Sequence, residues 1–206
     1  MNLELIKTLK EFPNVTVVAV SKTRTSDEID AVADAGLTIF GENRVQEFVA
    51  KYDPKYTWHI IGHLQTNKVK YVVGKADLIE SLDSIKLAKE IEKQAAKLNV
   101  IQKVLVQVKI SEDPMKTGLP YSQAVSFLKE LEDYPHICVK GFMCVASHTE
   151  NEDLIVREFD QMHYLYQSMK KIYPQIDTLS MGMSQDYQLA IAHGSNMVRI
   201  GHAIFE

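Results

Sequence analysis

Cysteine is scarce in this chain of 206 residues, which has only two, Cys138 and Cys144. Both fall in one strand-like segment that is poorly suited to a bridge between them, so we expect buried free thiols and a reducing compartment. A basic excess is also lacking, because 23 Lys and Arg stand against 27 Asp and Glu, a net charge of −4, with both signs interspersed. We therefore expect no nucleic-acid partner.

Long apolar runs are absent as well. No stretch approaches the ~18 apolar residues that a membrane-spanning helix needs, and the first residues carry no basic and apolar signal segment. We expect a cytoplasmic protein without a membrane partner. No linker or low-complexity segment interrupts the chain, and the composition, 46% hydrophobic and 24% charged, predicts one globular α/β domain over residues 1–206. The interspersed surface charge favours a monomer, and no metal site is predicted.

The first predicted strand ends in an unusual residue. Residues 15–20 are strand formers without alternation, which predicts a strand buried on both faces, as in a parallel sheet. Lys22 follows closely, and Ser26 or Asp27 is predicted to cap the next helix. Lys22 therefore lies in a βα turn, where functional groups of α/β folds concentrate. A lone lysine there usually only reaches water, so its interpretation depends on its neighbours.

Eight strand signals alternate with helical ones along the chain. They span residues 15–20, 37–42, 57–62, 77–83, 102–110, 137–145, 176–182 and 196–205. Eight βα repeats predict a single compact (β/α)8 barrel, and an open doubly wound sheet is the alternative. The last strand is predicted to have no helix after it, so we expect a helix over residues 2–11 to cover that gap.

Polar residues follow the predicted strand ends, which meet at one rim in a barrel. They are Lys22, Glu42, Asn43, Arg44, His63, Gln65, Asn67, Ser81, Asp83, Lys116, Thr117, His148, Ser184, Arg199, Gly201 and His202. A helix cap or a solvated loop is the favoured interpretation for Asp83, Thr117 and His148. The convergence of the others predicts a shared site.

The last two strand ends predict a phosphate site, because loops after strands seven and eight often bind phosphate in such barrels. Ser184 follows strand seven, and Gly201 allows a ligand to approach the backbone, so the amides of Gly201 and His202 can donate to it. With Lys22 and Arg199 at the same rim, the pattern favours a phosphorylated carbonyl cofactor held as a Schiff base. Pyridoxal phosphate fits best.

The chain resembles the YggS-type pyridoxal phosphate homeostasis proteins, relatives of the barrel domain of alanine racemase, over essentially its whole length. The matching motifs are AVSKT around Lys22, FGENRVQE (40–47), WHIIGHLQTNK (58–68), SLDS (81–84), KTGL (116–119), LSMGMSQDYQLAI (179–191) and GSNMVRIGHAIF (194–205).

The resemblance implies a role for each site residue. Lys22 would form the Schiff base, Asn43 would lie beside the cofactor, and Arg199 would meet its pyridine nitrogen. The phosphate would be held by Ser184, Gly201 and His202. His63 leaves the third strand towards the same mouth and is included among the predicted cofactor-binding residues.

The resemblance also implies a function in pyridoxal phosphate homeostasis, as a reversible carrier and buffer that is not an enzyme and that influences amino-acid and keto-acid balance. Delivery to apo-enzymes is a further expectation. Arg199 should leave the ring nitrogen unprotonated and the ring a weak electron sink, and we expect no second domain to supply an acid/base group. Two alternatives stay open. One is a pyridoxal-phosphate-dependent racemase or lyase with His63 or Tyr187 as proton donor, and the other is a cofactor-free Schiff-base lyase of the aldolase type.

Overall fold

The run of β-branched residues near the N-terminus forms β1 (Thr16–Val20), whose middle residues are buried. In the computed structural model, which describes residues 1–206, β1 pairs in parallel with β2 (Ile39–Glu42) on one side and β9 (Met197–Ile200) on the other. The same parallel pairing continues through β3 (Thr57–Ile60), β4 (Leu78–Leu82), β5 (Gln102–Lys109), β7 (Ile137–Met143) and β8 (Thr178–Ser180).

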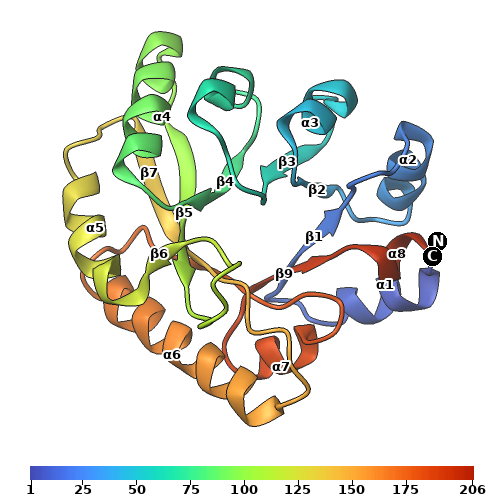
Figure 1. Cartoon of the computed structure of the whole chain (residues 1–206). Helices are drawn as coiled ribbons and strands as arrows, with labels where there is room; N and C mark the ends of the chain where they lie inside the picture. Colours follow the sequence, from blue (N-terminus) through green and yellow to red (C-terminus); the bar gives the residue numbers. More distant parts are fainter.

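Pairing between β4 and β5 closes these strands into a ring, so the predicted (β/α)8 barrel is confirmed and the open sheet is wrong. Figure 1 shows the strands around the middle of the molecule and the helices outside them. Each predicted strand overlaps one strand of the ring. A further short strand, β6 (Leu119–Pro120), pairs with β5 beside the ring.

Amphipathic helices cover the outside of the barrel. They are α1 (Leu3–Lys10), α2 (Ser26–Asp34), α3 (Val45–Lys51), α4 (Ile85–Leu98), α5 (Ala124–Leu131), α6 (Glu152–Lys170), α7 (Tyr187–Ala192) and α8 (His202–Phe205), with the 3₁₀ turns η1 (Thr66–Tyr71) and η2 (Tyr121–Gln123). In α4, for example, Leu87, Ala88, Ile91 and Ala95 are buried on the face towards the strands. None of the helices has both the length and the apolar character needed to cross a membrane.

Two details of the prediction were wrong. Residues 196–205 are not one strand, because β9 ends at Ile200 and α8 begins directly after Gly201. The cap of α2 is Thr25 rather than Ser26 or Asp27, since Thr25 and Glu28 exchange side-chain and backbone hydrogen bonds in a capping box.

The predicted N-terminal helix does cover the seam beside the last strand. Asn2 N donates a hydrogen bond to Ile204 O at 2.8 Å, which holds α1 against α8. Figure 1 shows the two helices side by side with the chain ends close together. Both cysteines are free; Cys144 is buried, but Cys138 is only partly buried, so the expectation of two buried thiols holds for one of them.

The interior of the barrel changes character along its axis. A small apolar cluster, Val18, Leu78, Leu105, Met143 and Met197, lies inside the ring. Side chains two residues apart on a strand share a face, so Glu80 and Arg199 follow Leu78 and Met197 on the same inner face, one step nearer the carboxyl ends of the strands. Polar groups therefore begin where the functional rim begins.

Candidate functional site

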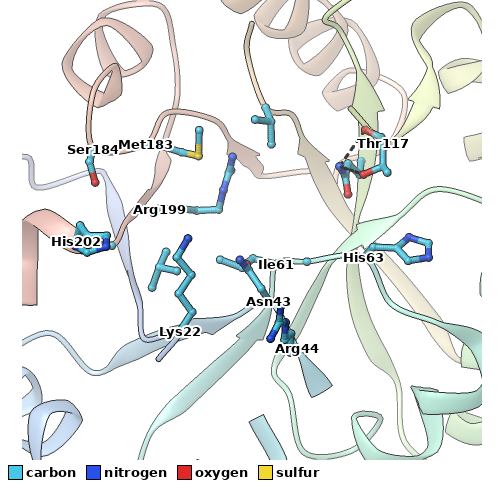
Figure 2. Close-up of a pocket in the computed structure, with 15 residues that line it drawn as sticks. Lys22, Asn43, Arg44, Ile61, His63, Thr117, Met183, Ser184, Arg199 and His202 are labelled. Carbon is cyan, nitrogen blue, oxygen red and sulfur yellow. Dashed lines mark hydrogen bonds between the residues drawn. The ribbon is translucent and has the colours of Figure 1, made fainter. Parts of the chain in front are cut away.

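A cavity of about 580 Å³ opens at the carboxyl ends of the strands, and this volume is in the usual range for small-molecule sites. Seven of its lining residues are those predicted from the sequence: Lys22, Asn43, His63, Ser184, Arg199, Gly201 and His202. The structure thus brings all of them to one place (Figure 2). Their part in cofactor binding stays a prediction.

The lining of the cavity is positively charged. Of its 15 residues, Lys22, Arg44 and Arg199 carry cationic side chains, and none is an aspartate or glutamate. In Figure 2, Lys22 and Arg199 occupy the middle of the view, with Ser184 and His202 on one side and His63 on the other. Such a lining favours an anionic ligand, because charges in a concave, partly desolvated site interact more strongly than in water.

A tight turn after β1 carries Lys22. Arg24 N donates to Ser21 O at 3.0 Å, which closes a four-residue turn with Lys22 in its second position. The third position, Thr23, has a φ of 63°, a left-handed conformation that is rare for a β-branched residue. Lys22 itself is exposed to solvent and its side chain extends from this turn into the cavity (Figure 2).

Arg199 forms part of the cavity floor and is only 4% exposed. Its Nη1 donates to Ser180 Oγ at 2.6 Å and its Nη2 donates to the Cys144 carbonyl at 2.8 Å. These bonds fix the plane of the guanidinium, while its further N–H groups stay available to a ligand. An arginine is a permanent donor, so it suits an acceptor such as an unprotonated ring nitrogen.

Beneath Arg199 lies a buried polar network that the sequence reasoning missed. Glu80 Oε1 is 2.7 Å from His59 Nδ1, and Glu80 Oε2 accepts from Ser180 Oγ at 2.6 Å. Burial raises the pKa of the Glu80 carboxyl, but the hydrogen bond and charge of His59, followed by the charge of Arg199, outweigh it, so the pKa lies below its ordinary value. The ionised Glu80 therefore balances cationic charge under the cavity.

The loop after β8 presents Ser184 to the cavity. Met183 N donates to Asp186 Oδ1 at 2.6 Å, which fixes the loop immediately beside Ser184. On the same side of the cavity, Gly201 and His202 stand at the start of α8, where the first amides of a helix have no partner within the helix. The His202 ring contacts Glu206 and lies 3.5 Å from Arg24 Nη2.

His63 lies at the edge of the site. Its side chain is 58% exposed, and its Nδ1 is 3.9 Å from Asp83 Oδ2. In Figure 2 the ring points away from Lys22 and Arg199. Burial raises the pKa of the Asp83 carboxyl, with a smaller opposing effect from the His63 charge. Asp83 does not line the cavity, but its interpretation as a helix cap or a solvated loop residue is wrong, because Ser84 caps α4 and the Asp83 side chain is only 16% exposed.

Thr117 is an exposed loop residue, as interpreted from the sequence, and it also lines the cavity. Gln107 Nε2 donates to the carbonyl and hydroxyl of Thr117 at 3.1 and 3.3 Å, and Gln107 is a lining residue that the sequence reasoning missed. The position of Gln107 near the end of β5 was the sequence signal that could have identified it. Thr117 reaches the cavity through a loop whose path no local sequence pattern indicates.

The other predicted rim residues lie outside this cavity. Lys116 and His148 line an adjoining cavity of about 360 Å³ that shares Ser184 with the first, and Gln65 lines a third. Glu42 and Ser81 are buried. Asn67 and Tyr187 are also absent from the lining of the main cavity.

Comparison with known proteins gives one consistent result. The family model described as "Alanine racemase, N-terminal domain" matches residues 1–206. The pyridoxal phosphate homeostasis protein of Pasteurella multocida is 39% identical over 199 residues, covering 93% of this chain and 85% of the relative. The protein of the same name from Aquifex aeolicus is 40% identical over 198 residues, covering 92% and 85%.

Solved structures agree with the sequence relatives. PipY of Synechococcus elongatus, solved with PLP bound, has a TM-score of 0.90 at 31% identity and covers 99% of each chain. An alanine racemase of Clostridium difficile has a TM-score of 0.84 at 14% identity, over 98% of this chain and 57% of its own, and shows the shared barrel alone. The chain belongs to the family of the pyridoxal phosphate homeostasis proteins, built on the alanine racemase N-terminal domain.

Proposed function

We propose that the protein binds pyridoxal phosphate in this cavity through a Schiff base with Lys22, and that it acts in homeostasis of the cofactor as a reversible carrier. The observation that carries the proposal is the joint lining: one lysine amine, two arginines and no carboxylate around a single cavity. The names of the relatives and the cofactor bound to PipY support the same ligand.

The residues present fit the chemical groups of this cofactor. Ser184 and the backbone at Gly201 and His202 supply neutral donors suited to a phosphate, as expected of the loops after the last two barrel strands. Arg199, held by Ser180 and the Cys144 carbonyl, supplies a donor for the ring nitrogen. Apolar contact for the ring comes from Val20, Ile61 and Val145, which also line the cavity.

Lys22 would hold pyridoxal phosphate through its aldehyde, a group that condenses with a primary amine with loss of one water molecule and is released again by water. The chain's own contribution is to hold the amine of Lys22 in the cavity and to fix the guanidinium of Arg199. A permanently protonated arginine gives the ring nitrogen no acidic proton, which weakens electron withdrawal by the ring. This arrangement suits retention and release better than carbanion chemistry.

A racemase or lyase needs a proton donor at the reacting carbon. Of the two candidates from the sequence, Tyr187 is not among the lining residues and His63 is. His63 is therefore the residue on which an enzymatic alternative depends. The cofactor-free lyase alternative predicts a colourless protein that ignores added pyridoxal phosphate.

The deciding experiment is an absorbance spectrum of the purified protein with pyridoxal phosphate, before and after borohydride reduction, followed by peptide mapping. We expect visible absorbance that reduction abolishes and a single reduced adduct on Lys22. A protein that gives no reducible adduct, or one on a different lysine, contradicts the proposal.

The carrier role further predicts that the loaded protein delivers its cofactor to apo-enzymes. We also expect the loaded protein to be a monomer. An apo-enzyme mixed with the loaded protein should gain activity faster than it does with free cofactor at the concentration that the carrier releases. Equal rates would show release into solution alone. Light scattering of the loaded protein measures the state of assembly.

A further inference from the structure

The turn that carries Lys22 is strained and is held from outside the barrel. Its third residue, Thr23, adopts a left-handed φ of 63°, a position that glycine usually takes in such turns. Strain of this kind persists only when surrounding contacts enforce it, and it concentrates at functional sites. The contacts at this turn come from three charged residues that do not line the cavity: Glu42, Glu47 and Lys51.

Lys51 binds the first residue of the turn. Its ammonium donates to the Ser21 carbonyl at 2.8 Å, to Glu42 Oε1 at 2.9 Å and to Glu47 Oε2 at 3.2 Å. The Lys51 side chain is only 12% exposed and Glu42 is fully buried, so solvent screens these contacts little. Glu42 Oε1 also accepts from the Ser21 hydroxyl at 2.7 Å.

Glu47 binds the strained residue directly. Its Oε2 accepts the backbone N–H of Thr23 at 2.8 Å, and this bond is the largest cause of a pKa below the ordinary value for the Glu47 carboxyl. Ser21 and Thr23 are the two neighbours of Lys22 in the chain. The turn is therefore held on both sides of Lys22 by one connected cluster on β2 and α3.

We propose that Glu42, Glu47 and Lys51 are positioning residues that hold the Ser21–Arg24 turn so that the Lys22 amine projects into the cavity. The inference rests on the proposed function and extends it to residues that contact neither the cavity nor the cofactor. Loss of this cluster should disturb covalent attachment at Lys22 while leaving the phosphate and ring contacts in place, because those come from β8, β9 and their loops.

Two ligands separate positioning from general stability. Pyridoxal phosphate has an aldehyde that can bond covalently to the Lys22 amine, whereas 4-deoxypyridoxine phosphate has no aldehyde and tests the phosphate and ring contacts alone. We expect Lys51→Met to weaken apparent affinity for pyridoxal phosphate roughly tenfold or more, the effect of losing hydrogen bonds to a charged group. Affinity for the deoxy compound should change less than about twofold. Lys51→Arg, which keeps the charge, should recover most of the loss.

The matched control is Lys140→Met. Lys140 on β7 forms a partly buried ion pair at 2.5 Å with Asp177, the residue before β8, outside the turn and the cavity. The Lys140→Met variant should leave the ratio of the affinities for pyridoxal phosphate and 4-deoxypyridoxine phosphate unchanged. If Lys51→Met does not fold, Glu47→Ala compared with Glu47→Gln tests the same point, because glutamine keeps an acceptor for Thr23 N while the Lys51–Glu42 contact remains.

The outcomes are distinct. If the Lys51 and Glu47 variants lose affinity for both ligands equally, or lose affinity for neither, the positioning role is overturned. A wild-type protein that binds both ligands but gives no borohydride-reducible adduct overturns the proposed function instead.

Discussion

Glu80 and Arg199 meet through a single hydroxyl group inside the barrel. Ser180 Oγ donates to Glu80 Oε2 at 2.6 Å and accepts from Arg199 Nη1 at 2.6 Å, while the nearest charged atoms of the pair are 4.0 Å apart. Both side chains are buried. The cation at the cavity floor is therefore balanced from below, and its remaining N–H donors stay available on the cavity side.

This relationship predicts that Glu80→Gln destabilises the protein by about 3–5 kcal/mol at neutral pH, because it leaves a buried cation without its counter-charge. The folded-state pKa of Glu80 lies below its ordinary value of 4.5, so the ionised form stabilises the fold above that pH. This stabilisation is lost as the pH falls through the folded-state pKa. Urea unfolding of both proteins at neutral and acidic pH should show the difference shrinking on acidification.

The control for this measurement is Glu130→Gln, at an exposed glutamate on α5. Its unfolding free energy should stay within about 0.5 kcal/mol of the wild type at both pH values. A Glu80→Gln protein as stable as the wild type at neutral pH would mean that the network stabilises nothing.

Lys22→Ala should abolish the visible absorbance and the reducible adduct, since no other lysine lines the cavity. Some non-covalent affinity should remain, because the phosphate side of the cavity is untouched. Lys116→Ala is the matched control, as Lys116 lines the adjoining cavity that shares Ser184. An adduct at comparable occupancy in Lys22→Ala that disappears in Lys116→Ala would transfer the role to Lys116.

Ser184→Ala should weaken retention of pyridoxal phosphate by about 1.5–3 kcal/mol, the usual effect of one hydrogen bond to a charged group. Pyridoxal without phosphate serves as the control ligand in equilibrium dialysis. Its affinity should hardly change. If both ligands weaken equally, Ser184 does not contact the phosphate.

The fold was predictable because its signals are local. Each strand of a parallel barrel is buried on both faces, and runs such as residues 15–20 carry that signal by themselves. The last strand was overextended for the same reason: Ile204 and Phe205 have the propensity of strand formers, yet they pack as part of α8. Tertiary contact, here with α1 through Asn2, decides their conformation.

The lining of the site was partly predictable and the support beneath it was not. Lys22 and Ser184 follow strand ends, a position that the sequence reveals. Glu80 and Ser180 are 100 residues apart, and their contact depends on the closed ring rather than on any spacing. The charged Glu80 within the apolar strand β4 was the one available signal, because buried carboxylates require partners.

Cys144 should resist alkylation in the folded protein. Burial raises the pKa of its thiol to about 12, with the Arg199 charge as a smaller opposing effect, so almost no reactive thiolate exists near neutral pH. Iodoacetamide labelling followed by mass spectrometry should modify the partly exposed Cys138 first and Cys144 only after unfolding. Rapid labelling of Cys144 in the native protein would show that the region around Arg199 opens.

No amino acid of either enantiomer should be racemised or decarboxylated by the protein at a rate well above that of free pyridoxal phosphate. Arg199 is fixed by Ser180 and the Cys144 carbonyl, and in the proposed binding mode it donates to the ring nitrogen without supplying an acidic proton, which would keep the ring a weak electron sink. His63, the remaining proton-donor candidate, is 58% exposed and turned away from Lys22 (Figure 2). The measurement is deuterium exchange at the α-carbon with wild type and His63→Ala. Exchange on the order of 1 per second or faster that His63→Ala stops would replace the carrier with an enzyme, whereas slow exchange that this variant leaves unchanged is the cofactor's own background reaction.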